Sequence, residues 1–130
     1  MNFVKTTLQD AFIIEPKVFF DPRGFFLESY SLKPFADNGI TTTFVQDNHS
    51  LSNGKGVLRG LHFQLPPHAQ TKLVRVASGA ILDVIVDLRK QSPTYGMWEG
   101  FELSADNFKM LYVPHGKMIK TVFVRIAKDY

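Results

Sequence analysis

The sequence predicts an all-β protein, either a barrel or a sandwich of short strands, and three observations favour this class. In residues 81–88 the aliphatic side chains at even positions share one face, while Asp83 and Asp87 fall on the other. This period of two is typical of a β-strand. Similar short runs recur at a spacing of about 8–12 residues, separated by turn-forming residues, and helical patterns are scarce.

The expected elements follow in chain order from these patterns. Strands are predicted at residues 12–14, 18–20, 25–30, 41–46, 73–77, 81–88, 98–103, 110–113 and 122–126. Glycine, proline, asparagine and serine between them mark turns at residues 21–24, 53–56, 66–67, 78–79 and 92–93. Only two stretches suggest a helix: residues 31–38, which end at Gly39, and a single turn at residues 104–107.

The polar face of the strand at residues 81–88 has two interpretations. Antiparallel sheets usually expose one face to solvent, which would place Asp83 and Asp87 at the surface. A small barrel can instead line its interior with polar groups that surround a ligand. The two aspartates alone do not decide between these interpretations.

Length and composition indicate one globular domain that covers residues 1–130. Hydrophobic residues make up 45% of the chain and charged residues 21%, which is ordinary for a soluble protein. The formal net charge of +3 is too small to indicate a nucleic-acid partner, but it suits a small anionic ligand. The chain has no cysteine, which excludes disulfides and thiolate metal sites.

No targeting or membrane segment is recognisable in the sequence. Residues 1–10 lack the apolar stretch and basic flank of a signal peptide. No apolar run approaches the roughly 20 residues that span a bilayer. A cytoplasmic location without a membrane partner is therefore expected.

The densest cluster of chemically useful side chains lies between residues 57 and 72, and contains Arg59, His62, Gln64, His68 and Lys72. A histidine with an unperturbed pKa near 6.5 can act as a base at neutral pH. An ammonium group can stabilise an oxyanion that forms when a proton leaves carbon beside a carbonyl. An arginine can hold a phosphate through two hydrogen bonds. Taken singly, however, such residues more often lie in solvated turns than in active sites, and His68 stays in that class.

Several longer segments, in the same order, resemble one enzyme family. They are Glu15–Phe19, Asp21–Tyr30, Phe44–Ser50, Val57–Gln64, Asp83–Trp98, Leu103–Ala105 and Val113–Pro114. Together they resemble the dTDP-4-dehydrorhamnose 3,5-epimerases, over roughly residues 5 to 116. The resemblance implies a cupin-like jelly-roll barrel, a homodimer and a nucleotide-diphosphate sugar as substrate. It further implies an isomerase that inverts C3, C5 or both in a 4-keto-6-deoxyhexose by removing protons alpha to the ketone.

The resemblance also implies that no metal or other cofactor takes part. Metal-binding cupins offer His-x-His followed by a glutamate, whereas this chain has His62, then Gln64, and Lys72 further on. Ile119 stands where the third histidine ligand would be.

Roles of individual residues are carried over from the same resemblance. His62 would be the base, Lys72 would stabilise the enolate and Tyr130 would be the acid on the opposite face of the sugar. Asp83 would lie near the sugar, and Arg59 would bind the diphosphate. The residues expected to hold the nucleotide, across a dimer interface, are Arg23, Glu28, Gln46, Asp47 and Asn48.

The sequence departs from the family after Gly116. Relatives continue with Phe-Ala-His-Gly-Phe, whereas this chain continues with Lys117 and has Ile119 in place of a histidine that contacts substrate. The residues around Tyr130 also differ from the family pattern, and the C-terminal aspartate that pairs with the catalytic histidine is not present. Two alternatives therefore stay open: a nucleotide-sugar-binding relative with impaired catalysis, and an isomerase that moves the ketone from C4 to C3.

Overall fold

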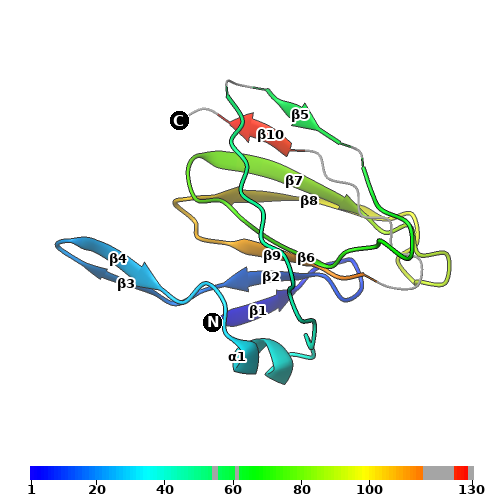
Figure 1. The fold of residues 1–130 in the computed structure, drawn as a ribbon, viewed down its shortest axis with the longest axis horizontal. Coiled ribbons are helices and arrows are strands. Elements are labelled where there is room, and N and C mark those ends of the chain that lie inside the picture. The colour runs from blue at the N-terminus through cyan, green and yellow to red at the C-terminus, as the bar shows by residue number, and fades with distance from the viewer. Residues whose placement is uncertain (54–55, 61, 116–124, 129–130) are drawn as a thin grey trace.

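The computed structural model describes residues 1–53, 56–60, 62–115 and 125–128. In these residues the chain forms two four-stranded sheets, a separate two-stranded hairpin and one short helix (Figure 1). All neighbouring strands pair antiparallel. The prediction of an all-β fold is therefore confirmed.

The first sheet combines the first two strands of the chain with two strands that come much later in the sequence. Its strands lie in the order β1 (Asn2–Lys5), β2 (Phe12–Glu15), β9 (Met110–Val113) and β6 (Lys72–Arg75). All four residues of β9 are buried, because this strand has a β-strand on each side and packs on both of its faces.

The second sheet faces the first. Its strands lie in the order β5 (Leu58–Arg59), β10 (Arg125–Lys128), β7 (Ala80–Val86) and β8 (Trp98–Ser104). The longest pairing joins β7 to β8 over seven residues. The tail of the chain thus supplies a strand, β10, at part of the range where alternation predicts one.

The core has two parts. One lies between the sheets and draws on both of them, with Val74 and Leu111 from the first sheet and Ile85 and Leu103 from the second. The other lies on the opposite face of the first sheet, where helix α1 (Leu32–Asp37) inserts Phe35. This helix falls within the predicted stretch and is followed by Gly39, whose φ of +81° suits a helix end.

The hairpin of β3 (Val18–Asp21) and β4 (Gly24–Leu27) extends from the side of the two sheets, as Figure 1 shows. Phe20 and Phe25 are paired across the hairpin, and both pack against the ring of Phe108. Phe19 and Phe26 form the next pair, on the other face, and are 52% and 71% exposed.

The polar face of β7 points into the space between the sheets. Asp83 is fully buried and Asp87 is 4% exposed, and Ile85 between them belongs to the core cluster shared by both sheets. The interior interpretation is therefore correct for this strand. Leu82, Val84 and Val86, on the opposite face, are only half-buried.

Not every predicted strand is present. Residues 41–46 form no strand, and Val45 in this segment is 92% exposed. Alternation alone does not distinguish such an irregular segment from a strand. Conversely β1 and the two-residue β5 were not predicted. The turn after β8, at residues 105–107, agrees with the expected single turn.

In the part of the chain that is described, no helix has the length and apolar character needed to cross a membrane.

Candidate functional site

Lys72 and Asp83 reach the interior of the barrel from opposite sheets. Side chains two apart on a strand share a face. Lys72 therefore lies on the same face as Val74, and Asp83 on the same face as Ile85, and both of these aliphatic residues belong to the core between the sheets. Lys72 and Asp83 each interact with other parts of the protein. The sequence thus places a cation and a buried carboxylate in one interior.

Arg59 lies on the same face of the second sheet as Asp83. Both residues are directly opposite Arg125 of β10, one from each side. Directly opposed residues of an antiparallel pair share a face, and two interstrand steps separate the Arg59 and Asp83 backbones by about 10 Å. The Arg59 guanidinium donates hydrogen bonds to Ser52 Oγ at 3.1 Å and to the Leu51 carbonyl at 3.3 Å. This tether fixes the direction of an otherwise exposed arginine.

His62 follows the end of β5 by three residues and is exposed. Gly60 lies between Arg59 and His62 with a φ of +134°, a conformation that glycine adopts without steric cost. The strand therefore ends at Arg59, and His62 lies on the irregular segment that follows. His62 also makes an interaction within the protein.

The predicted nucleotide-binding residues lie on two other segments. Gln46, Asp47 and Asn48 are exposed on the unpaired stretch that precedes β5, where the Gln46 amide donates to Asn48 Oδ1 at 3.0 Å. Arg23 is at the tip of the β3–β4 hairpin, and Glu28 follows β4; both are exposed. The structure thus groups Arg59, Lys72 and Asp83 around the interior, and holds Arg23 and Glu28 on a separate projecting element (Figure 1). Tyr130 and Ile119 lie outside the described residues.

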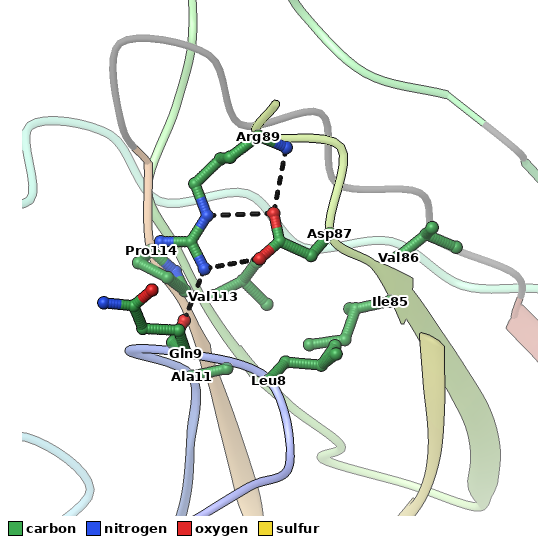
Figure 2. A pocket seen from close by; sticks show the side chains of 9 residues that line it. All are labelled: Leu8, Gln9, Ala11, Ile85, Val86, Asp87, Arg89, Val113 and Pro114. Atoms are coloured by element: carbon green, nitrogen blue, oxygen red, sulfur yellow. Dashed lines mark hydrogen bonds and ion pairs between the residues drawn. The ribbon is translucent and has the colours of Figure 1, made fainter. Parts of the chain in front are cut away.

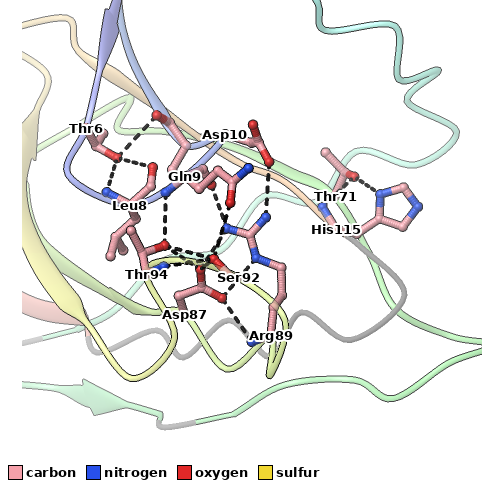
Figure 3. A network of polar contacts seen from close by, with 11 residues as sticks. Thr6, Leu8, Gln9, Asp10, Thr71, Asp87, Arg89, Ser92, Thr94 and His115 are labelled. Atoms are coloured by element: carbon pink, nitrogen blue, oxygen red, sulfur yellow. Dashed lines mark hydrogen bonds and ion pairs between the residues drawn. The ribbon is translucent and has the colours of Figure 1, made fainter.

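A polar network that sequence analysis did not identify joins the two sheets at one end of the barrel. We call it the barrel-end joint; it comprises Gln9, Asp10, Asp87, Arg89, Ser92 and Thr94. Figure 3 shows the Asp87 carboxylate at its centre, bound by Arg89 Nη2 at 2.7 Å, Ser92 Oγ at 2.5 Å and Thr94 Oγ1 at 2.6 Å. The same guanidinium donates to the Gln9 carbonyl at 2.7 Å, in the turn between β1 and β2.

Electrostatics of the joint favour the ionised pair. Burial of Asp87 alone would raise its pKa, but hydrogen bonds from Arg89, Ser92 and Thr94 outweigh that effect and hold the pKa well below its usual range. The hydrogen bond to Asp87 in turn raises the pKa of Arg89. The only sequence signal for this joint was Asp87, which lies on the polar face of the strand predicted at residues 81–88 and directly follows β7 in the structure.

A small cavity adjoins the joint, and Figure 2 shows its lining. The lining residues are Leu8, Gln9, Ala11, Ile85, Val86, Asp87, Arg89, Val113 and Pro114. None of them was predicted as a site residue, and the charged members, Asp87 and Arg89, are paired with each other. The cavity is therefore better explained as an imperfection of packing at the joint than as a ligand site.

A second unpredicted contact lies beside Lys72. Thr71 Oγ1 is 2.6 Å from Nδ1 of His115 and accepts the backbone N–H of His115 at 3.2 Å. The next residue, Lys72, lies directly opposite Val113 in the antiparallel pairing of β6 with β9. The contact therefore fastens the beginning of β6 to the chain just beyond β9, next to the candidate site.

The family and the fold follow from comparison with known proteins. A family profile described as dTDP-4-dehydrorhamnose 3,5-epimerase matches residues 5–124. The dTDP-4-dehydrorhamnose 3,5-epimerase of Shigella flexneri is 56% identical over 117 residues, which cover 89% of this chain and 64% of that protein. The enzyme of the same name from Methanothermobacter thermautotrophicus is 53% identical, over 88% of this chain and 61% of that protein.

Solved structures agree. The dTDP-4-dehydrorhamnose 3,5-epimerase of Elizabethkingia anophelis superimposes with a TM-score of 0.87 at 48% identity, over 98% of this chain and 67% of that one. The Legionella pneumophila dTDP-6-deoxy-D-glucose-3,5-epimerase, in complex with dTDP-4-keto-L-rhamnose, superimposes with a TM-score of 0.86 at 43% identity. The match covers 97% of this chain and 64% of that one.

Two facing antiparallel sheets around a partly polar interior define a cupin-type barrel, as the resemblance implied. Within that class, the chain belongs to the dTDP-4-dehydrorhamnose 3,5-epimerase family. It spans somewhat less than two thirds of the length of these curated relatives, at 64% and 61%.

Proposed function

We propose that this chain epimerises a nucleotide-linked 4-keto-6-deoxyhexose at C3, C5 or both, with thymidine diphosphate as the nucleotide. The observation that carries the proposal is the interior shared by Lys72 and Asp83, with Arg59 on the same sheet face, in a chain that belongs to this family. The Legionella relative is described with dTDP-4-keto-L-rhamnose bound, which supports this class of ligand.

The proposed chemistry is a pair of balanced proton transfers. The C4 ketone acidifies the hydrogens on both C3 and C5. His62 takes one of these protons, and the electron pair of the broken C–H bond moves into an enolate whose oxygen is stabilised by the Lys72 ammonium. A proton returned to the same carbon from the opposite face, by Tyr130, completes the inversion. No electron is gained or lost overall.

The nucleotide requires a different set of residues. The guanidinium groups of Arg59 and Arg23 bind the diphosphate, because planar guanidinium matches phosphate oxygens through two hydrogen bonds. Gln46, Asp47, Asn48 and Glu28 offer amide and carboxylate groups for the nucleoside.

A homodimer completes this proposal. Arg23 and Glu28 lie on a projecting hairpin whose Phe19 and Phe26 are more than half exposed. Exposed apolar patches of this kind mark contact surfaces. We place the hairpin of each protomer against its partner. We further propose that residues 1–130 form one domain and that the protein works in the cytoplasm.

The test is incorporation of solvent deuterium into dTDP-4-keto-6-deoxyglucose, followed by NMR. We expect exchange at C3, C5 or both, and we expect His62→Ala to abolish it. His68→Ala is a matched control, because His68 is an exposed histidine of the same segment. Exchange that persists in His62→Ala would exclude His62 as the base.

Two other outcomes would point to the alternatives. Tight binding of thymidine diphosphate without any exchange would indicate a binding protein with impaired catalysis, which the isoleucine at position 119 favours. Formation of a 3-keto sugar would indicate an isomerase on the same barrel.

A further inference from the structure

The tip of the β3–β4 hairpin is organised by one carboxylate. Asp21 Oδ1 accepts the backbone N–H of Arg23 at 2.8 Å, which closes a side-chain-stabilised turn. Gly24, next along the chain, has a φ of +138°, which a residue with a side chain rarely adopts. The direction of the backbone at Arg23 is therefore set by Asp21 and Gly24 together.

The same carboxylate holds the side chain of Arg23. Nη2 of Arg23 lies 2.6 Å from Oδ2 of Asp21, and Nε lies 3.2 Å from Oδ2 and 3.3 Å from Oδ1. These contacts occupy one edge of the guanidinium, the edge formed by Nε and Nη2. The hydrogen bond to Arg23 also lowers the pKa of Asp21, so the pair is ionised at neutral pH.

A guanidinium has a second edge, formed by its two terminal nitrogens, that can bind an anion through parallel hydrogen bonds. In the described part of the chain the Arg23 guanidinium has no partner other than Asp21, and its side chain is 90% exposed. The second edge is therefore open to a ligand. A free exposed arginine samples many rotamers and loses that freedom on binding, whereas Arg23 is already held in one.

We propose that Asp21 is a positioning residue that fixes the Arg23 guanidinium so that its open edge receives a phosphate of the nucleotide diphosphate. This inference rests on the proposed function. It runs against the simplest electrostatic expectation, in which a carboxylate near an anionic ligand weakens binding. Asp21 lies on the far edge of the guanidinium from the phosphate, and at this exposed tip water screens the repulsion between them.

A double-mutant cycle tests the proposal, with binding of thymidine diphosphate measured by calorimetry. Asp21→Asn keeps an Oδ1 acceptor for the Arg23 N–H, so the turn is retained while the negative charge is lost. We expect Asp21→Asn to weaken binding by about three- to tenfold, the range for a charge-assisted hydrogen bond at an exposed site. In the Arg23→Gln background the same change should have no further effect, because the guanidinium that Asp21 orients is gone.

The control is Asp37→Asn. Asp37 is also an exposed aspartate paired with a cation, Lys33 at 2.7 Å on helix α1, so the variant makes the same change in net charge away from the tip. It should leave binding unchanged.

Three results would overturn the proposal. Binding by Asp21→Asn that equals or exceeds wild type would show that the carboxylate competes with the ligand or plays no part. Equal weakening in the Arg23→Gln background would show a structural effect on the hairpin. Wild type that binds no thymidine diphosphate would overturn the proposed function together with this inference, and that result is distinct from the first two.

Discussion

At the scale of single residues, Lys72 is the group whose charge the proposed chemistry uses most directly. It is half-buried at the beginning of β6, on the face that lines the interior, across from the fully buried Asp83. An ammonium in such a place stabilises a developing enolate more strongly than it would in water, because the surrounding dielectric is low.

Replacing Lys72 with methionine is therefore expected to slow solvent exchange of the sugar proton by about 10²–10³-fold, the usual cost of losing one oxyanion-stabilising donor. Deuterium incorporation by NMR measures this effect, and thymidine diphosphate binding shows whether the variant is folded. The matched control is Lys109→Met, at a half-buried lysine outside the candidate site, whose Nζ lies 3.6 Å from Glu15 Oε1. Exchange at the wild-type rate in Lys72→Met would remove Lys72 from the mechanism.

Asp87 supports the fold rather than the chemistry. Its side chain is 2% exposed and forms a salt bridge with Arg89, whose side chain is 16% exposed. Removing one member of a buried pair leaves the other charge without compensation, which costs about 3–5 kcal/mol.

We expect Asp87→Ala to lower the free energy of unfolding by about 3 kcal/mol, measured by urea denaturation. Asp10→Ala removes the other carboxylate that contacts Arg89, but Asp10 is 60% exposed, so its loss should cost less than about 1 kcal/mol. Equal losses from the two variants would show that burial does not determine the strength of this joint.

At the scale of elements, the sequence located most strands but not their environment. Alternation at residues 81–88 predicted β7, yet whether Asp83 faced solvent or interior depended on the opposite sheet, which lies far away in sequence. The segment 41–46 alternates as well, but it forms no strand. The periodicity of apolar residues in the sequence shows which side chains share a face of a strand. Only tertiary packing determines what that face contacts.

The same limit applies to the site. The residue types between positions 57 and 72 indicated Arg59, His62 and Lys72 as candidates, and the resemblance added Asp83. The barrel-end joint was missed because Arg89 contacts the Gln9 carbonyl from 80 residues away, and neither residue type suggests such a contact. Pairings of this kind follow from the order of strands in the sheets, which short-range patterns do not specify.

The β3–β4 hairpin is the element on which the proposed dimer depends. Phe19 and Phe26 are directly opposed on one face, and a Lys17 ammonium lies 4.9 Å above the Phe19 ring. Burial of two phenylalanines against a partner would stabilise a dimer substantially, because aromatic residues contribute much of the binding free energy of interfaces.

Phe26→Ser is expected to raise the dimer dissociation constant at least about tenfold, which corresponds to about 1.4 kcal/mol. Sedimentation velocity over a range of concentrations measures the change. Val45→Ser is the control, since Val45 is 92% exposed but lies outside the hairpin. A wild-type protein that is monomeric at all concentrations would contradict the dimer, and an unchanged dimer in Phe26→Ser would contradict the assigned surface.

At the scale of the whole molecule, the two sheets are held together by apolar packing and by polar contacts at one end. The turn between β1 and β2 reaches across to the second sheet at several points. Thr7 donates to Glu99 of β8 through both its backbone N–H and its hydroxyl, and the backbone N–H of Gln9 donates to Thr94 Oγ1 at 3.2 Å. Together with the contacts of Asp87 and Arg89 that Figure 3 shows, these bonds join the two sheets at that end of the barrel.

The stability of the folded barrel should therefore decrease at acid pH as Asp87 becomes protonated. The pKa of this carboxyl is lower in the folded protein than in the unfolded chain, where it is near 3.8, so the folded state binds fewer protons. Its contribution to stability is present above the unfolded pKa and is lost as the pH falls toward the folded pKa. We expect the free energy of unfolding of wild type to fall more steeply between about pH 5 and pH 2 than that of Asp87→Asn. Urea denaturation across this range measures both slopes. The Asp37→Asn variant, whose aspartate is exposed on helix α1, should keep the wild-type slope, and a wild-type slope in Asp87→Asn would show that other carboxylates govern acid unfolding.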